Sequence, residues 1–338
     1  MSSAATPGTP LPVRTPGSRA RGRHRRPERP EIPAGAPALL LAVPAHADPE
    51  LYSLVWEIAS LVRGEQFGVD ITAGWLSRPE PAAGAGSDTG AGEAGDAPAG
   101  SAPGEAASAE AAPAEAAPGL PWEGYDVRDY PLITEVLARA VEEERPVPVV
   151  VPLLVGPAGD LHAALEQAIG ASGTQPVVTD VLGPHPLLSE AVHVRLSEAG
   201  LARADRARLF TINTAADGIV LATAGGEEAV QEAAAVTGVL LAARLAVPVI
   251  PAALDIPGSV AAAADHLRQS GCVQPAIAPF LVGPEVPPGT IAAAAKEAGL
   301  PAAEPLGAYP GIARLVLGSY LGAIGVEMEQ PAQAAPLG

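Results

Sequence analysis

The segment PLLVGP at residues 152–157 returns almost unchanged as PFLVGP at residues 279–284. A second matching pair follows at a similar distance, because LGPHPL at residues 182–187 has the counterpart LGAYPG at residues 306–311. Two six-residue matches in the same order indicate that the chain contains an internal repeat. The repeat therefore decides how the chain is divided into structural units.

The repeat extends to the start of each half. Residues 39–43 form a short apolar run typical of a buried strand, and residues 219–223 form a similar one. The order of elements is then the same in both halves once a low-complexity segment is set aside. We expect two similar lobes in tandem, over residues 37–202 and 206–326.

Strand-like and helix-like segments alternate through the first lobe, which predicts an α/β fold with a mainly parallel sheet flanked by helices. Val, Leu and Ile run together in the expected strands, and apolar residues recur at helical spacing in the expected helices. The expected strands are residues 39–43, 69–73, 147–154 and 177–181, and the expected helices are residues 51–61, 131–144, 161–169 and 187–199.

Three segments have a composition that cannot form a core. Residues 1–36 carry seven Arg against two Glu, and residues 79–120 are dominated by Ala, Gly, Pro and Ser with seven acidic residues and no basic one. We expect the first to be a disordered basic tail, the second a disordered insertion in a loop, and residues 327–338 a disordered C-terminal tail.

Composition also excludes several classes of protein. The net charge is −18 although residues 1–36 carry a net charge of +5, so nucleic acid is an unfavourable partner for the acidic remainder. The single cysteine, Cys272, forms no disulfide within one chain. No apolar run is long enough for a membrane span, and no secretory signal or nucleotide-binding fingerprint is present. A cytoplasmic protein without a nucleotide cofactor is expected.

Four segments of the first lobe resemble a known family, the small ATP-independent sirohydrochlorin chelatases. The first strand of that family runs into His-Gly-Ser-Arg-Asp-Pro, where this chain has PAHADP at residues 44–49. A later strand reads Val-Pro-Leu-Phe-Leu and precedes Gly-x-His, where this chain has VPLLV at 151–155 and GDLH at 159–162. The family's Leu-Gly-Pro-His-Pro-Leu is matched by residues 182–187.

The resemblance implies insertion of Co²⁺ or Fe²⁺ into a tetrapyrrole, in cobalamin or siroheme biosynthesis. Pro44 and Asp160 stand where the family has its two histidines, and Ala47 replaces its arginine. His46 and His162 each lie two residues later, which in an extended segment is the same face. The resemblance therefore makes His46 and His162 the candidate catalytic residues, and His46, Asp160 and His162 the candidate metal ligands.

The remaining histidines have simpler interpretations. His185 lies between two prolines and is expected to fix a turn before a helix, while His193 and His266 fall in helices. Two other functions stay open beside the chelatase. One is a pseudoenzyme that binds a metal or a tetrapyrrole on the same scaffold, and the other is an interaction protein that works through its tail and insertion.

Overall fold

The structure is a computed structural model that describes residues 31–46, 49–77, 131–202 and 216–326. The predicted acidic insertion, the C-terminal tail and residues 1–30 of the basic tail lie outside the described residues. Residues 31–36, also assigned to the tail from composition, form a turn in which the N–H of Ala36 donates to the carbonyl of Pro33 at 3.0 Å. Ile32 packs against the main core.

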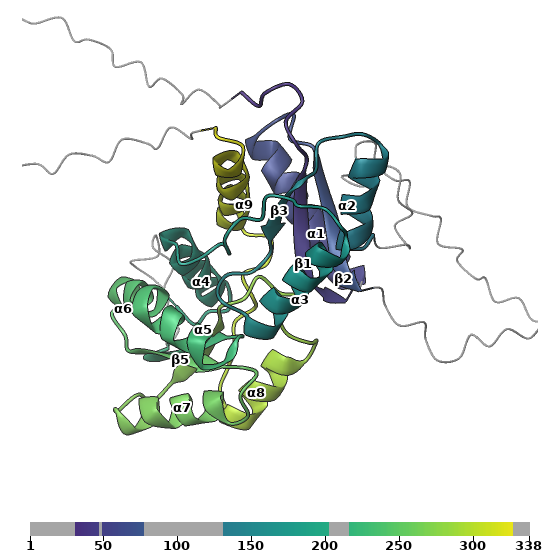
Figure 1. Cartoon of the computed structure of the whole chain (residues 1–338). Coiled ribbons are helices and arrows are strands. Elements are labelled where there is room, and N and C mark those ends of the chain that lie inside the picture. Colours follow the sequence, from purple (N-terminus) through teal and green to yellow (C-terminus); the bar gives the residue numbers. More distant parts are fainter. Residues whose placement is uncertain (1–30, 47–48, 78–130, 203–215, 327–338) are drawn as a thin grey trace, which may run out of the picture.

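Two three-stranded parallel sheets form the framework, and their strands share the same order. In the first lobe, β1 (Leu39–His46) lies between β2 (Ile71–Ser77) and β3 (Val149–Pro152). In the second lobe, β4 (Gly218–Thr223) lies between β5 (Val249–Ala253) and β6 (Pro275–Pro279). The predicted α/β class and the duplicated sheet are confirmed (Figure 1).

The strands of the two sheets are paired in the same register. Leu40 is paired with Val150 in the first sheet, as Val220 is paired with Ile277 in the second. Further along, the N–H of Leu182 donates to the carbonyl of Leu154 at 2.8 Å, and Leu306 donates to Leu281 at 2.9 Å. The repeated sequence segments therefore occupy equivalent places.

The fourth predicted strand of the first lobe, residues 177–181, is wrong as a strand, since it forms only a bridge between Val178 and Val150. Val177 and Val178 are 55% and 43% exposed at the sheet edge, so burial does not hold the segment extended. The second lobe has the matching bridge between Ala302 and Ile277. The fourth strand is thus reduced to one bridge in both halves.

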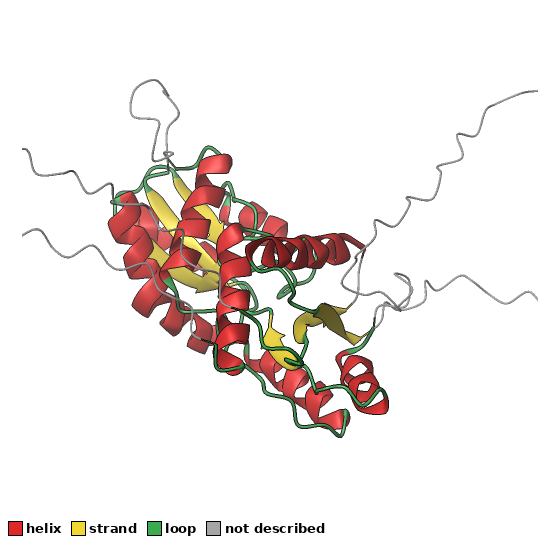
Figure 2. Cartoon of the chain, turned by 90° about the horizontal axis from the view of Figure 1, so that it is seen from above, coloured by secondary structure: helices red, strands yellow, loops and turns green. Residues whose placement is uncertain are grey.

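Helices cover both faces of each sheet, as Figures 1 and 2 show. The four helices predicted in the first lobe are confirmed, with ends that differ by a few residues. The helices are α1 (Pro49–Glu65), α2 (Ile133–Glu142), α3 (Gly159–Ala171), α4 (Pro186–Glu198), α5 (Gly226–Ala233), a π-helical turn η1 (Ala234–Gly238), α6 (Val239–Leu245), α7 (Ser259–Gln269), α8 (Thr290–Ala298) and α9 (Pro310–Ala323). Among the described residues, no helix is long and apolar enough to cross a membrane.

The last helix of each lobe packs on the other lobe. Helix α9 lies against α1 and β3 of the first lobe, and α4 lies against α6, η1 and β6 of the second (Figure 1). One core cluster consequently runs through both lobes and includes Leu41 and Val151 from the first sheet and Leu221 and Ala278 from the second. Each lobe completes the core of the other, so we expect the two lobes to unfold together.

Candidate functional site

His46 lies at the carboxyl end of the central strand β1, where open parallel sheets bind ligands. Its side chain is exposed, and its Nδ1 is hydrogen-bonded to the hydroxyl of Ser77 at the end of β2. The register between β1 and β2 shifts between Val43 and His46, so the strand exit is bent where the histidine projects. The Ser77 bond fixes the ring and leaves Nε2 as the nitrogen open to a ligand or a proton.

Asp160 and His162 lie in the first turn of α3, which packs against β1 and β2. Asp160 is exposed, and the positive end of the helix dipole stabilises its negative charge. Nε2 of His162 is 3.4 Å from Oε1 of Glu166, one turn further along the helix. Two of the candidate metal ligands therefore lie in one helix turn, and one of them, His162, has a carboxylate neighbour in Glu166.

The three predicted metal ligands, His46, Asp160 and His162, do not form a metal-binding group in this structure. Within the part of the chain that is described, no group of three or more His, Cys, Asp or Glu side chains is placed to hold a metal ion. His46 is instead held by Ser77, and His162 by Glu166. The roles assigned to His46, Asp160 and His162 thus stay predictions, and a metal bound there would need further ligands from water or substrate.

Two of the other described histidines, His185 and His193, have structural roles. His185 is the N-cap of α4, where its Nδ1 accepts a 3.1 Å hydrogen bond from the N–H of Leu187. Burial lowers the pKa of His185, which keeps the ring neutral and able to accept that bond. The buried His193 accepts a 2.6 Å bond at Nδ1 from Nε of Arg244, on α6 of the second lobe. The helical positions predicted for His193 and the exposed His266 are confirmed.

The second lobe has a glycine turn where the first lobe has its histidine. The N–H groups of Gly225 and Gly226 donate to Oδ2 of Asp255 at 3.1 and 2.9 Å. Gly225 has a φ of 112°, and a Cβ atom at this position would overlap the carbonyl oxygen of Pro157 in the first lobe. The turn is therefore a point where the two backbones touch, which explains the glycine pair without a phosphate ligand.

Glu285 is a buried acid that the sequence interpretation missed. It is 7% exposed, and its carboxylate accepts hydrogen bonds of 2.7 Å from the N–H groups of both Val282 and Gly283. Burial raises the pKa of Glu285 to about 7, although hydrogen bonds from the backbone of Gly283, Val282 and Glu285 itself favour the ionised form. The only signal in the sequence is that Glu285 occupies the position of Ala158 in the first repeat.

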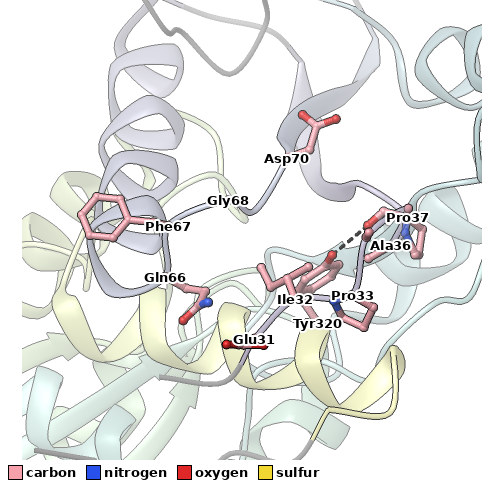
Figure 3. A pocket seen from close by; sticks show the side chains of 12 residues that line it. Glu31, Ile32, Pro33, Ala36, Pro37, Gln66, Phe67, Gly68, Asp70 and Tyr320 are labelled. Carbon is pink, nitrogen blue, oxygen red and sulfur yellow. Dashed lines mark hydrogen bonds between the residues drawn. The ribbon is translucent and has the colours of Figure 1, made fainter. Parts of the chain in front are cut away.

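A large cavity lies at the opposite end of the first sheet, near the amino ends of β1 and β2. It has a volume of about 580 Å³ and is lined by Glu31, Phe67, Asp70 and Tyr320, among others (Figure 3). The hydroxyl of Tyr320 donates to the carbonyl of Pro37 at 2.8 Å, which ties α9 to the start of the first lobe. None of the predicted site residues lines this cavity, so it does not contain the chemistry expected from the sequence.

Comparison with known proteins gives a solved structure but no family assignment. No family model matches the chain, and no curated protein matches it. Among solved structures, the chain is similar to the sirohydrochlorin chelatase SirB from Bacillus subtilis subspecies spizizenii, crystallised in complex with cobalt. The TM-score is 0.48 and the sequence identity is 13%, over 86% of this chain and 96% of that chain.

Proposed function

We propose that the protein is a metal chelatase of the sirohydrochlorin type, which inserts Co²⁺ or Fe²⁺ into a tetrapyrrole without a nucleotide. The observation that carries the proposal is the His46 imidazole, exposed at the carboxyl end of the central strand and oriented by Ser77. The repeated segments and the equal strand order of the two lobes support the same scaffold.

The chemistry of insertion sets what the site must do. A divalent metal replaces two pyrrole N–H protons, so the site needs a base that takes up protons and a ligand that holds the cation until the macrocycle takes it. With Nδ1 bonded to Ser77, His46 offers Nε2 for one of these tasks. In its neutral form an imidazole can act as a base or bind a divalent metal.

His162 and Asp160 are proposed to supply the second group. Both side chains belong to the first turn of α3, and Asp160 adds a carboxylate, which suits a first-row divalent cation together with imidazole. The neighbouring Glu166 carboxylate orients the His162 ring through Nε2. His162 would then present Nδ1, whereas His46 presents Nε2.

Metal insertion into sirohydrochlorin tests this proposal. The initial rate is followed by the change in tetrapyrrole absorbance with Co²⁺, for the wild-type protein and the His46→Ala variant. Loss of a general base lowers a rate by roughly 10²–10⁴-fold, so the variant should lose most activity. His266→Ala is the matched control, because it removes an exposed histidine of α7 in the second lobe. A wild-type rate equal to that without protein would refute the proposal.

A binding or carrier protein on the same scaffold is the second candidate. The observation that favours it is that Pro44, Asp160 and Ala47 stand where the chelatase family has its two histidines and its arginine. Such a protein would bind Co²⁺ or the tetrapyrrole in a calorimeter while leaving the insertion rate at the level without protein. Binding and insertion measured on one sample therefore separate the two functions.

A further inference from the structure

The large cavity at the amino ends of β1 and β2 is framed by two segments, residues 31–37 and 66–70, and by Tyr320 of α9 (Figure 3). Its volume of about 580 Å³ is within the range of small-molecule sites. His46 lies at the other end of β1, so a ligand in this cavity would not reach the candidate chelatase site. The cavity is therefore a separate candidate for ligand binding.

The first wall of the cavity, residues 31–37, is held in place by the rest of the fold. Ile32 packs against the main core, and the carbonyl of Pro37 accepts the 2.8 Å hydrogen bond from Tyr320. In the repeat, Tyr320 of α9 corresponds to Leu196 of α4, and both side chains are buried. The tyrosine hydroxyl is thus added to an apolar packing position, and it fixes the wall before any ligand binds.

The second wall is specific to the first lobe. Residues 66–70 connect α1 to β2, whereas the second lobe connects α6 to β5 through the shorter segment 246–248, which carries no charge. By strand register Ile71 is equivalent to Val249, so Asp70 stands where the second lobe has Pro248. The repeated fold forms without a long acidic connection, and packing therefore does not explain why the first lobe has one.

The cavity is negatively charged. Of the described residues that line it, Glu31 and Asp70 are the charged ones, and both are exposed. Tyr320 belongs to the last turn of α9, which contains no basic residue, so the negative end of this helix dipole adds to the two carboxylates. Burial and then the charge of Asp70 raise the pKa of Tyr320, as expected in a negative environment. The cavity should therefore attract a cation.

The protein compensates this charge only weakly. Nη1 of Arg145 is 4.0 Å from Oδ2 of Asp70, and the two side chains are 55% and 66% exposed. Nε of Arg145 is closer to a carboxylate oxygen of Glu143, at 3.0 Å. Exposed pairs of this kind contribute little, and Arg145 does not line the cavity. Asp70 is thus open to a positively charged ligand.

The arrangement of the lining selects the kind of cation. Asp70 and Glu31 belong to the two facing segments, and Figure 3 shows them on opposite sides of the cavity. An ammonium group at each end of a flexible chain can therefore pair with both carboxylates. Ile32 and Pro33 give methylene groups an apolar surface, and Phe67, which is 74% exposed, offers an aromatic ring that attracts a cation. Ligands that carry carboxylates, such as amino acids or a polycarboxylate tetrapyrrole, would be repelled.

We propose that the cavity between residues 31–37 and 66–70 binds a linear aliphatic diamine, with one ammonium group at Asp70 and the other at Glu31. Both ion pairs are exposed, so the affinity is modest and falls as the salt concentration rises. The site makes no use of His46 or His162, and it adds a small-molecule ligand to the first lobe that is independent of the proposed metal insertion.

Isothermal titration calorimetry of the full-length protein with 1,4-diaminobutane, at low and fixed ionic strength, tests the site. Asp70→Asn and Glu31→Gln should each weaken binding about fivefold, which is the upper range for the loss of one exposed ion pair. 1-Aminobutane should bind the wild type about fivefold more weakly than the diamine does, because it pairs with one carboxylate only. Both acids are exposed, so the variants should fold, which thermal unfolding verifies.

Glu297→Gln is the matched control, because it removes the same charge from an exposed position on α8 of the second lobe. It should bind the diamine as tightly as the wild type does. His46→Ala should do the same, which separates this result from the fate of the chelatase proposal. The proposal is overturned if the wild type does not bind 1,4-diaminobutane, if either Asp70→Asn or Glu31→Gln binds it as tightly as Glu297→Gln, or if 1-aminobutane binds the wild type as tightly as the diamine.

Discussion

The buried Glu285 should make the stability of the whole protein depend on pH. The pKa of its carboxyl group rises from an ordinary value of 4.5 to about 7 in the folded protein. Between these values the folded state holds a proton that the unfolded state has lost. The folded state is therefore favoured at low pH, and its stability falls as the pH rises from about 4.5 through 7.

The size of the effect follows from the shift. One pKa unit corresponds to roughly 1.4 kcal/mol, so the ionisation of Glu285 should lower the free energy of unfolding by about 3 kcal/mol between pH 4.5 and pH 8. Solvent screening should reduce this free energy only slightly, because Glu285 is only 7% exposed. Above pH 8 the contribution should level off.

Urea unfolding of the wild-type protein and Glu285→Gln measures this contribution. Tryptophan fluorescence, to which the buried Trp75 of the first lobe contributes, reports whether the core shared by the lobes has unfolded. Other titrating groups are common to both proteins, so they cancel in the difference of the two unfolding free energies. The wild type should lose about 3 kcal/mol relative to the variant as the pH rises. If the difference between the two unfolding free energies stays constant from pH 4.5 to pH 8, Glu285 does not hold a proton in the folded protein at these pH values.

Three further predictions concern the scaffold. His185→Ala removes the N-cap of α4 and should cost about 1 kcal/mol in chemical unfolding, while the Co²⁺ affinity measured by calorimetry stays the same. Gly225→Ala places a methyl group on the carbonyl of Pro157 and should lower Tm more than Gly226→Ala, whose Cβ meets nothing within 4 Å although its φ is also positive. Equal losses of Tm would contradict the backbone contact. Each lobe expressed alone should lack a cooperative thermal transition, since its core is completed by the last helix of the other lobe; a sharp transition in either would contradict this.

The repeat in the sequence predicted the two sheets because similar apolar segments need equivalent surroundings. It did not predict the exchange of α4 and α9. The apolar residues of a helix show that one face is buried, but they do not show which of two similar sheets buries it. The loops before these two helices are similar, LGPHP at residues 182–186 and LGAYP at residues 306–310, so either sheet was an acceptable partner in sequence terms.

The site was predictable only in part. The pleat placed His46 on the open end of β1, but its partner Ser77 belongs to another strand and has no signature of its own. Glu285 was missed because a glutamate after a Gly-Pro turn is normally solvated.

The most direct test of the chelatase proposal is the rate of Co²⁺ insertion into sirohydrochlorin by the wild-type protein and by a variant in which His46 and His162 are both alanine. Both residues are exposed or half-buried at the surface, so the variant should fold, which a wild-type circular dichroism spectrum would verify. We expect the wild type to accelerate insertion and the double variant to fall to the rate without protein. A folded double variant that inserts Co²⁺ as fast as the wild type would contradict the assignment of the chemistry to these two histidines.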